Sequence, residues 1–283
     1  MQAPLRMPPA LKAGDCVMVV APARFATEPQ LQAAVRWLEG WGLQGVMHPH
    51  SSARQNQFGG SDAERIDAFN AALRDPSVRA IWAIRGGYGC TRLLPHLDAD
   101  AFLNDPKWLV GFSDVTALHG WASNLGVASV HAPVLNTVPS TPEEDLLALK
   151  SLLFSGMASS WQGERRVVGG NLSVLYALCG TPYMPPLQGR WLLLEDLDEY
   201  LYHVDRMLVS LKQAGVFQQV EGVLVGSFDG LRDNTVADGQ SVDNPFGETL
   251  EDMIREHVGS LGIPVEWEVP VGHGARNHPC LLG

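Results

Sequence analysis

A serine stands between an apolar run and a helical pattern in the segment Gly111-Phe-Ser113-Asp114. Ligands of open parallel α/β sheets bind beyond the carboxyl ends of the strands, so the hydroxyl of Ser113 is expected at a ligand-binding edge. Backbone amides at the start of the following helix can stabilise a developing oxyanion there. The segment is not a Gly-x-Ser-x-Gly turn, because Val115 replaces the second glycine. Ser113 is a candidate nucleophile, although helix capping by Ser113 or Asp114 is the commoner role of such residues.

A glycine-rich loop, Arg85-Gly-Gly-Tyr-Gly89, follows another apolar run. Its glycines permit positive φ and leave backbone amides uncovered, so the loop can hold an anion or an oxyanion. It contains neither a Gly-x-x-x-x-Gly-Lys-Ser/Thr pattern nor a complete Gly-x-Gly-x-x-Gly pattern. A plain tight turn explains the glycines equally well.

An acid and a base occur in the second half of the chain. Glu195 directly follows the apolar residues 192–194, where a carboxylate is costly unless it is paired. His273 lies between two glycines in a loop, where packing does not obviously require an imidazole. A solvated acidic loop and an incidental histidine remain the alternatives. His48 and His50 flank a proline without the i, i+4 spacing of a helical metal pair, and no metal site is expected.

The order of apolar runs and helical patterns predicts a parallel sheet covered by helices. Strands are expected over residues 15–21, 79–84, 108–111 and 128–131, with helices over 30–41, 61–73 and 114–125. A proline-rich break at residues 137–142 precedes a change of rhythm, which predicts a domain boundary between about 140 and 165. Beyond the break, helices are expected over 143–153, after Gly169-Gly-Asn171, and over 201–214 and 244–258, with strands over 190–194 and 220–228.

Composition restricts the class of protein. The 283 residues carry a net charge of -11, which argues against nucleic acid or an anionic membrane as a partner. No apolar stretch approaches the roughly 20 residues that cross a bilayer. The first ten residues lack the basic and apolar regions of a signal peptide. Four widely spaced cysteines, at positions 16, 90, 179 and 280, are expected to be reduced thiols, and a cytoplasmic protein is expected.

Nine short motifs in a fixed order resemble the LD-carboxypeptidase family of serine peptidases, which includes the muramoyltetrapeptide carboxypeptidases and the microcin C self-immunity proteins. Each motif alone is weak, but their joint order over nearly the whole chain is specific. The motifs are Val20-Ala-Pro22, Arg85-Gly-Gly-Tyr-Gly89, Gly111-Phe-Ser-Asp114, Gly169-Gly-Asn-Leu172, Gly180-Thr-Pro182, Leu194-Glu-Asp196, Asp205-Arg-Met-Leu208, Gly226-Ser-Phe228 and Gly272-His-Gly274.

The resemblance implies a role for each residue that matches a motif. It implies that Ser113 is the nucleophile, His273 the base and Glu195 the acid that orients the base, with Glu199 as the alternative acid. It implies a backbone oxyanion hole and no cofactor or metal. The amides of that hole would come from Gly86 or Gly87 and from Asp114.

A carboxypeptidase must also bind the terminal carboxylate of its substrate. Arg85 beside the glycine loop is a candidate, with Arg276 and Arg206 as further ones, although Arg206 is expected to pair with Asp205 or Glu199. Tyr88 and Asn171 are further substrate-binding candidates.

The resemblance also implies the architecture and the activity. We expect an α/β protein with an N-terminal parallel-sheet domain of flavodoxin or class I glutamine amidotransferase type over residues 1–155. A smaller α/β domain of the swivelling type is expected over residues 160–283. Family members usually continue with a short final segment beyond the His273 loop, so the chain is expected either to be truncated or to lack one edge strand. The implied protein is a homodimer that releases terminal D-alanine from murein tetrapeptides through an acyl-enzyme.

Three other functions fit parts of the sequence. A microcin C-type self-immunity hydrolase would cleave an aminoacyl-nucleotide amide and would need a surface for adenine, for which Trp161, Tyr183 and Tyr202 are candidates. A non-catalytic small-molecule-binding protein would not need the full set of Ser113, Glu195 and His273. A flavodoxin-like nucleotide protein would leave the acid and the base unexplained.

Overall fold

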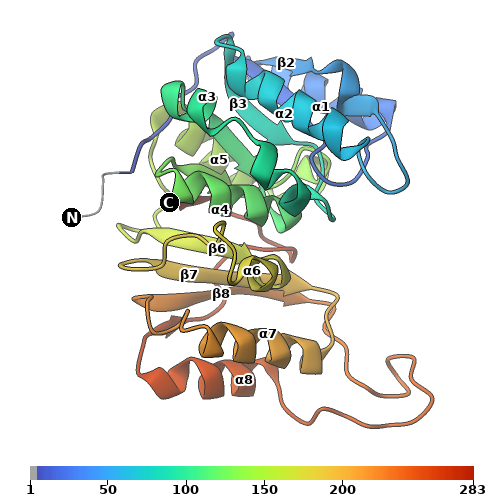
Figure 1. Ribbon diagram of the computed structural model, residues 1–283, viewed down its shortest axis with the longest axis vertical. Helices are drawn as coiled ribbons and strands as arrows, with labels where there is room; N and C mark the ends of the chain where they lie inside the picture. Colours follow the sequence, from blue (N-terminus) through green and yellow to red (C-terminus); the bar gives the residue numbers. More distant parts are fainter. Residues whose placement is uncertain (1–4) are drawn as a thin grey trace.

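One continuous ten-stranded sheet runs through the computed structural model, which describes residues 5–283. Its strand order is β2-β1-β3-β4-β5-β10-β6-β7-β8-β9. Neighbouring strands are parallel throughout, except that β10 is antiparallel to β5. Figure 1 shows the N-terminal half of the chain above and the C-terminal half below, with the end of the chain returning to the middle. This architecture confirms the predicted α/β fold with a mostly parallel sheet.

The N-terminal half alternates strands and helices, as the apolar pattern predicts. Its strands are β1 (Cys16–Val20), β2 (Gln44–Met47), β3 (Val78–Ala83), β4 (Trp108–Gly111) and β5 (Ser129–His131). Its helices are α1 (Glu28–Gly40), α2 (Asp62–Arg74), α3 (Ala99–Asn104), α4 (Thr116–Asn124) and α5 (Glu143–Ser155).

The C-terminal half contains the other five strands. They are β6 (Val167–Asn171), β7 (Trp191–Leu197), β8 (Gly222–Asp229), β9 (Val265–Glu266) and β10 (Cys280–Leu282). The helices of this half are α6 (Leu172–Leu178), α7 (Leu201–Gln213) and α8 (Leu250–His257). In Figure 1, α7 and α8 lie together below β8, and the long segment between β8 and α8 extends away from the body at the lower right.

Local sequence signals explain where several helices begin. Ser61 and Glu64 form the predicted capping box of α2, since the Ser61 amide donates to Glu64 Oε2 at 2.8 Å. The prediction that the last helix starts at residue 244 is wrong. A second capping box, between Thr249 and Asp252, starts α8 at Leu250 instead. The preceding residues form an irregular loop in which the Phe246 amide donates to Asp233 Oδ1.

The sequence analysis did not predict the shortest strands and helices. Strand β2 is a partly exposed four-residue edge strand, β9 has two residues, and β10 has three. Helix α3 has six residues and is started by the side chain of Asp98. None of these segments is long enough to show a helical or alternating period.

The core consists of four apolar clusters, two formed mainly by the N-terminal half of the chain and two by the C-terminal half. Helix α5 packs through Leu149, Leu152 and Leu153 against the strands of the N-terminal half. From Val167 onward, apart from Leu178, fully buried residues join the two clusters of the C-terminal half. We retain the division at residues 155–160 as a prediction that agrees with this distribution.

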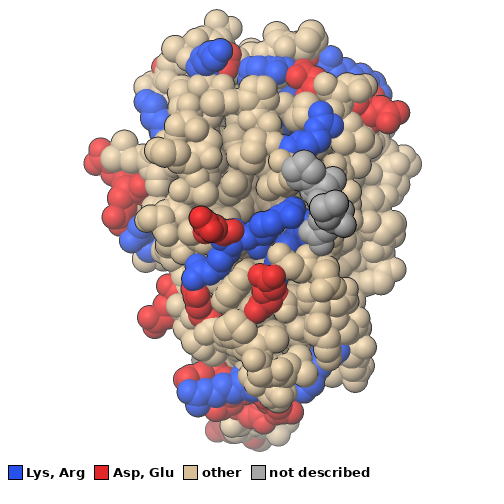
Figure 2. Space-filling model, turned by 90° about the vertical axis from the view of Figure 1, so that its left-hand side faces the viewer, with Lys and Arg blue, Asp and Glu red and all other residues tan. Residues whose placement is uncertain are grey.

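Within residues 5–283 no helix is long and apolar enough to span a membrane. The first four residues of the segment considered for a signal peptide lie outside the described residues. On the face in Figure 2, a band of basic side chains crosses the middle with acidic side chains on both sides. This face lacks the extended basic surface that nucleic acid requires.

Candidate active site

Ser113 occupies a strained turn at the carboxyl end of β4. Its φ is +61°, in the left-handed region that costs a non-glycine residue about 1–3 kcal/mol. The short 3-10 turn η4 (Ser113–Val115) follows, and α4 then begins at Thr116. Neither Ser113 nor Asp114 caps a helix by its side chain, because the cap positions are Phe112 and Val115 and carry no such bond. The capping explanation for this segment is therefore wrong.

The glycine loop lies directly against Ser113. A Cβ atom on Gly86 would lie 2.9 Å from both Cβ and Oγ of Ser113, so only glycine allows this approach. The carboxylate of Asp114 fastens the loop, since its Oδ2 accepts from the Cys90 amide at 2.8 Å. Burial raises the pKa of Asp114 despite this bond. Arg65 Nη1 supports the loop from α2 by donating to the Gly89 carbonyl at 3.0 Å.

Two substrate-binding candidates stand beside this loop. Arg85 is half-buried, and no described residue forms a hydrogen bond or an ion pair with its guanidinium. Tyr88 is 47% exposed and contacts the ring of Phe58, with centroids 5.8 Å apart. Arg85 can thus meet a ligand without breaking an existing hydrogen bond, whereas the Tyr88 side chain interacts with Arg92.

Glu195 and His273 form a buried pair. His273 Nδ1 lies 2.6 Å from Glu195 Oε2, and the glutamate side chain is fully buried near the end of β7. A Cβ atom on Gly272 would lie 2.3 Å from Ser227 Oγ and 3.2 Å from Glu195 Cβ, so glycine there lets the histidine loop approach β7 and β8. The Gly274 amide donates to the same Ser227 Oγ at 3.0 Å and so holds the histidine loop against β8.

The electrostatics of this pair favour a charged carboxylate. Burial alone would raise the pKa of Glu195, but the hydrogen bond with His273 and the nearby imidazoles of His273 and His131 lower it to about 2. Burial alone would lower the pKa of His273, but the hydrogen bond and charge of Glu195 raise it above its ordinary value. The imidazole is thereby made a stronger base.

His131, a residue that the sequence analysis did not single out, also faces Glu195. It ends β5, is fully buried, and places Nε2 3.8 Å from Glu195 Oε1. Within the described residues, neither ring nitrogen of His131 nor Oε1 of Glu195 has a hydrogen-bond partner. The carboxylate thus has a histidine on each side. A buried histidine at the end of an apolar strand was the only sequence signal for it.

Asp196 and Asn171 form a second polar network behind the pair. Asp196 Oδ1 accepts from Asn171 Nδ2 and Oδ2 accepts from the Ser173 amide, both at 2.9 Å. Burial and the charge of Glu195 raise the pKa of Asp196 to about 6. The Asn171 side chain also caps α6. This amide therefore serves the fold, and its contact with substrate stays a prediction.

The other predicted charged residues have partners away from His273. Arg276 binds the fully buried Asp145 through Nη2 at 2.6 Å and Glu144 through Nη1 at 2.8 Å. Glu199 pairs with His203 at 2.5 Å. The prediction that Arg206 pairs with Asp205 or Glu199 is wrong, because Asp205 pairs with His257 and Arg206 lies over the Tyr202 ring.

Phe112, the residue before Ser113, joins the part of the site on β4 to the loop of His273. The rings of Phe112 and His273 are in contact, with centroids 4.5 Å apart. A cavity of about 100 Å³ beside them is lined by Phe112, residues 137 and 140–142, and the histidine loop. Within the described residues the Ser113 hydroxyl has no hydrogen-bond partner. In free enzymes such catalytic hydrogen bonds are often long and tighten only with substrate.

Comparison with known proteins gives the family of the chain. The sequence model of the LD-carboxypeptidase N-terminal domain matches residues 17–132, and that of the C-terminal domain matches residues 164–283. A probable murein peptide carboxypeptidase of Bacillus subtilis is 32% identical over 98% of this chain and 89% of its own. The protein is thus a two-domain α/β carboxypeptidase.

Solved structures extend the likeness to three dimensions. A muramoyltetrapeptide carboxypeptidase from Oxalobacter formigenes superposes with a TM-score of 0.80 and 27% identity, over 94% of this chain and 93% of its own. MccF in complex with glutamyl sulfamoyl guanosine has a TM-score of 0.82 and 21% identity, over 99% of this chain and 94% of its own, which shows the shared fold. The chain belongs to the LD-carboxypeptidase family.

Proposed function

We propose that this carboxypeptidase hydrolyses the amide before a terminal D-alanine in murein tetrapeptides, with Ser113, His273 and Glu195 as its catalytic triad. The observation that carries the proposal is the 2.6 Å contact between His273 Nδ1 and the buried Glu195. A base oriented by an acid is what a serine nucleophile requires. The strained turn at Ser113 and the glycine loop against it support the same assignment.

The proposed mechanism uses Nε2 of His273 as the general base. Because Nδ1 is bound to Glu195, Nε2 of His273 takes the proton as Ser113 Oγ bonds to the carbonyl carbon. Amides of the Gly86–Gly87 turn and of Asp114 would hold the oxyanion, and in comparable sites one such donor contributes about 3 kcal/mol. The imidazolium then protonates the departing D-alanine nitrogen as the C–N bond breaks. Water, deprotonated by His273, hydrolyses the acyl-enzyme and regenerates Ser113. These steps use protein groups and water alone.

The direct test is the product formed from a defined disaccharide tetrapeptide, followed by mass spectrometry. The proposal expects D-alanine and the tripeptide. Cleavage at any other bond, or no cleavage by the folded enzyme, contradicts it.

The pH dependence of catalysis offers a second test. The pKa of His273 is raised above its ordinary 6.5 by Glu195, and the base must be neutral to act. We therefore expect kcat/KM to rise with pH through a midpoint above 6.5 and to be lost on the acid side. NMR titration of the imidazole in Ser113→Ala should give the same midpoint, and adding Glu195→Gln should lower it. An unchanged midpoint in the double variant would show that Glu195 does not act on His273.

We propose Arg85 as the group that binds the terminal carboxylate, with Tyr88 beside it. A charged hydrogen bond contributes about 1.5–3 kcal/mol, so Arg85→Gln should raise KM by about ten- to hundredfold with little change in kcat. Arg276→Gln is the matched control. It removes a partner of buried Asp145 and should lower the melting temperature while KM stays near the wild-type value. The reverse pattern would move the carboxylate site to Arg276.

The aromatic residues considered for adenine binding do not lie at this site. Trp161 lines a cavity of about 660 Å³ with Trp191, which begins β7 four residues before Glu195. Tyr183 packs against the N-terminal core, and Tyr202 lies over the segment near Gln240. No observation at the site therefore favours the microcin-type substrate over a murein peptide, and incubation with both would separate them.

The resemblance further supports a cytoplasmic homodimer as the working form. All four cysteines are free thiols, which agrees with a reducing compartment. Light scattering coupled to gel filtration would measure the mass of the particle, and a monomer at working concentration would contradict the dimer.

A further inference from the structure

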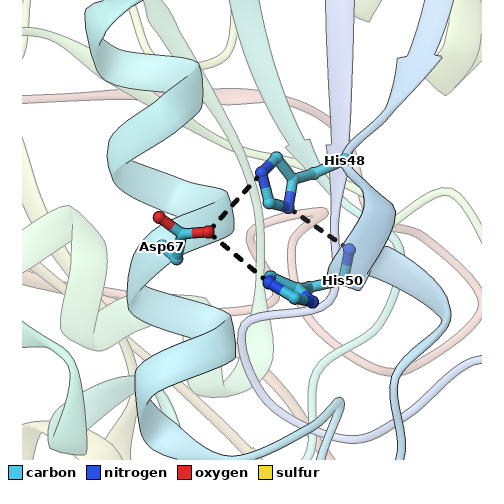
Figure 3. Close-up of side chains that lie close together, drawn as sticks. All are labelled: His48, His50 and Asp67. Atoms are coloured by element: carbon cyan, nitrogen blue, oxygen red, sulfur yellow. Dashed lines mark hydrogen bonds and ion pairs between the residues drawn. The ribbon is translucent and has the colours of Figure 1, made fainter.

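Two histidines and an aspartate outside the proposed catalytic site converge on one point in the N-terminal half. His48 follows β2, His50 lies in the 3-10 turn η1 (Pro49–Ser52), and Asp67 lies on α2. Figure 3 shows the two imidazoles and the carboxylate pointing toward one another. One oxygen of Asp67 lies 3.7 Å from His48 Nε2 and 3.5 Å from His50 Nε2. The spacing of the two histidines in the sequence did not predict this, because the third group comes from another element.

We propose that His48, His50 and Asp67 form a binding site for a zinc ion. Zinc is held by imidazole nitrogen and carboxylate oxygen at about 2.0–2.2 Å in a tetrahedron, which sets neighbouring ligand atoms about 3.4 Å apart. The three candidate ligand atoms lie within 4.8 Å of one another, and the two nitrogen–oxygen distances are already close to that value. Small side-chain rotations complete the geometry.

The surroundings hold two of the ligands in place. Glu64 Oε1 lies 3.9 Å from His50 Nδ1, on the side away from Asp67, so this carboxylate can orient the ring from behind. The capping box of α2 occupies the other oxygen of Glu64. The Ser51 hydroxyl accepts from the His48 amide and donates to the Val19 carbonyl, which ties η1 to β1. Binding through His48 Nε2 would cost only the long 3.3 Å contact from the His50 amide to His48 Nδ1.

A zinc ion bound by these three side chains could take water as its fourth ligand. The side chains of His48, His50 and Asp67 are 17%, 39% and 63% exposed, so water can reach an ion bound between them. Imidazole ligands favour zinc over magnesium and calcium, which prefer sites made of oxygen alone. The ion would join η1 to α2, the helix whose Arg65 supports the Gly89 carbonyl of the glycine loop. We assign it a structural role, separate from catalysis.

The test is a zinc titration of the full chain by calorimetry after treatment with a chelator and in the presence of a reductant. The wild-type protein should bind one ion per chain, and zinc should raise its melting temperature. His50→Gln and Asp67→Asn should each weaken binding by more than about tenfold, since even a residue that only orients a ligand contributes that much. His203→Gln, at a histidine on α7 in the C-terminal half, should bind as the wild type does, and excess magnesium should not displace the zinc.

Three results would overturn the assignment. They are no binding by the wild type, unchanged binding in both His50→Gln and Asp67→Asn, or equal displacement by magnesium. Zinc bound instead at His273 or by a cysteine would leave binding unchanged in both His50→Gln and Asp67→Asn. The two substitutions change exposed side chains on different elements, so at least one folded variant is expected, and circular dichroism identifies it.

Discussion

Replacement of Ser113 by alanine should reduce D-alanine release by about four to six orders of magnitude, the loss seen when the nucleophile of a serine hydrolase is removed. The fold should persist, because alanine retains the Cβ atom that packs against Gly86 and the lost hydroxyl has no hydrogen-bond partner among the described residues. Release of D-alanine from a purified disaccharide tetrapeptide measures the loss, and the melting temperature reports the fold.

A matched control separates the loss of a nucleophile from the loss of any hydroxyl. Ser210 on α7 donates only to a carbonyl within its own helix, so Ser210→Ala should retain full activity. A covalent phosphonate probe should label the wild type and Ser210→Ala at Ser113 and leave Ser113→Ala unlabelled. Residual activity within tenfold of the wild type in Ser113→Ala would end the serine mechanism.

Replacement of Glu195 by glutamine should lower kcat by about 10⁴-fold, the effect of the corresponding change in a Ser-His-Asp triad. Glutamine retains the shape of the side chain but removes the charge that stabilises the imidazolium and fixes its tautomer. Since His131 Nε2 lies 3.8 Å from the other oxygen, the neutral amide also removes the negative charge that lies between the imidazoles of His131 and His273. Single-turnover kinetics at saturating substrate measure the chemical step.

Glu199→Gln is the control that distinguishes the two candidate acids. Glu199 pairs with His203 on α7 and, among the described residues, forms no hydrogen bond or ion pair with His273, so this variant should keep kcat within about threefold of the wild type while the helix loses a partly exposed pair. A large loss in Glu199→Gln together with normal activity in Glu195→Gln would assign the orienting role to Glu199 instead.

The parallel sheet could be predicted because its central strands are buried on both faces and read as short apolar runs. Strands β1, β3 and β4 lie within two residues of their predicted bounds. The edge strand β2 and the short strand β10 could not be predicted. Their residues are few, and their pairing depends on partners far away in the sequence.

The sequence motifs proposed the residues of the candidate site but gave no information on its geometry. The order of motifs pointed to Ser113, Glu195 and His273, but no sequence rule shows that Ser113 has a positive φ or that Asp114 holds the glycine loop through Cys90. His131 was missed because a histidine at the end of an apolar strand has no distinctive local spacing. The zinc ligands were missed because Asp67 comes from a helix that reads only as an amphipathic element.

Strand β10 joins the two blocks of the sheet by pairing with β5 on one side and β6 on the other, although it consists of residues 280–282. Translation therefore produces both blocks before the strand that connects them. The loop of His273 emerges at the same late stage, after Ser113 and Glu195 have long been available to fold. In the proposed mechanism a nascent chain therefore has a nucleophile without a base until the His273 loop has been synthesised.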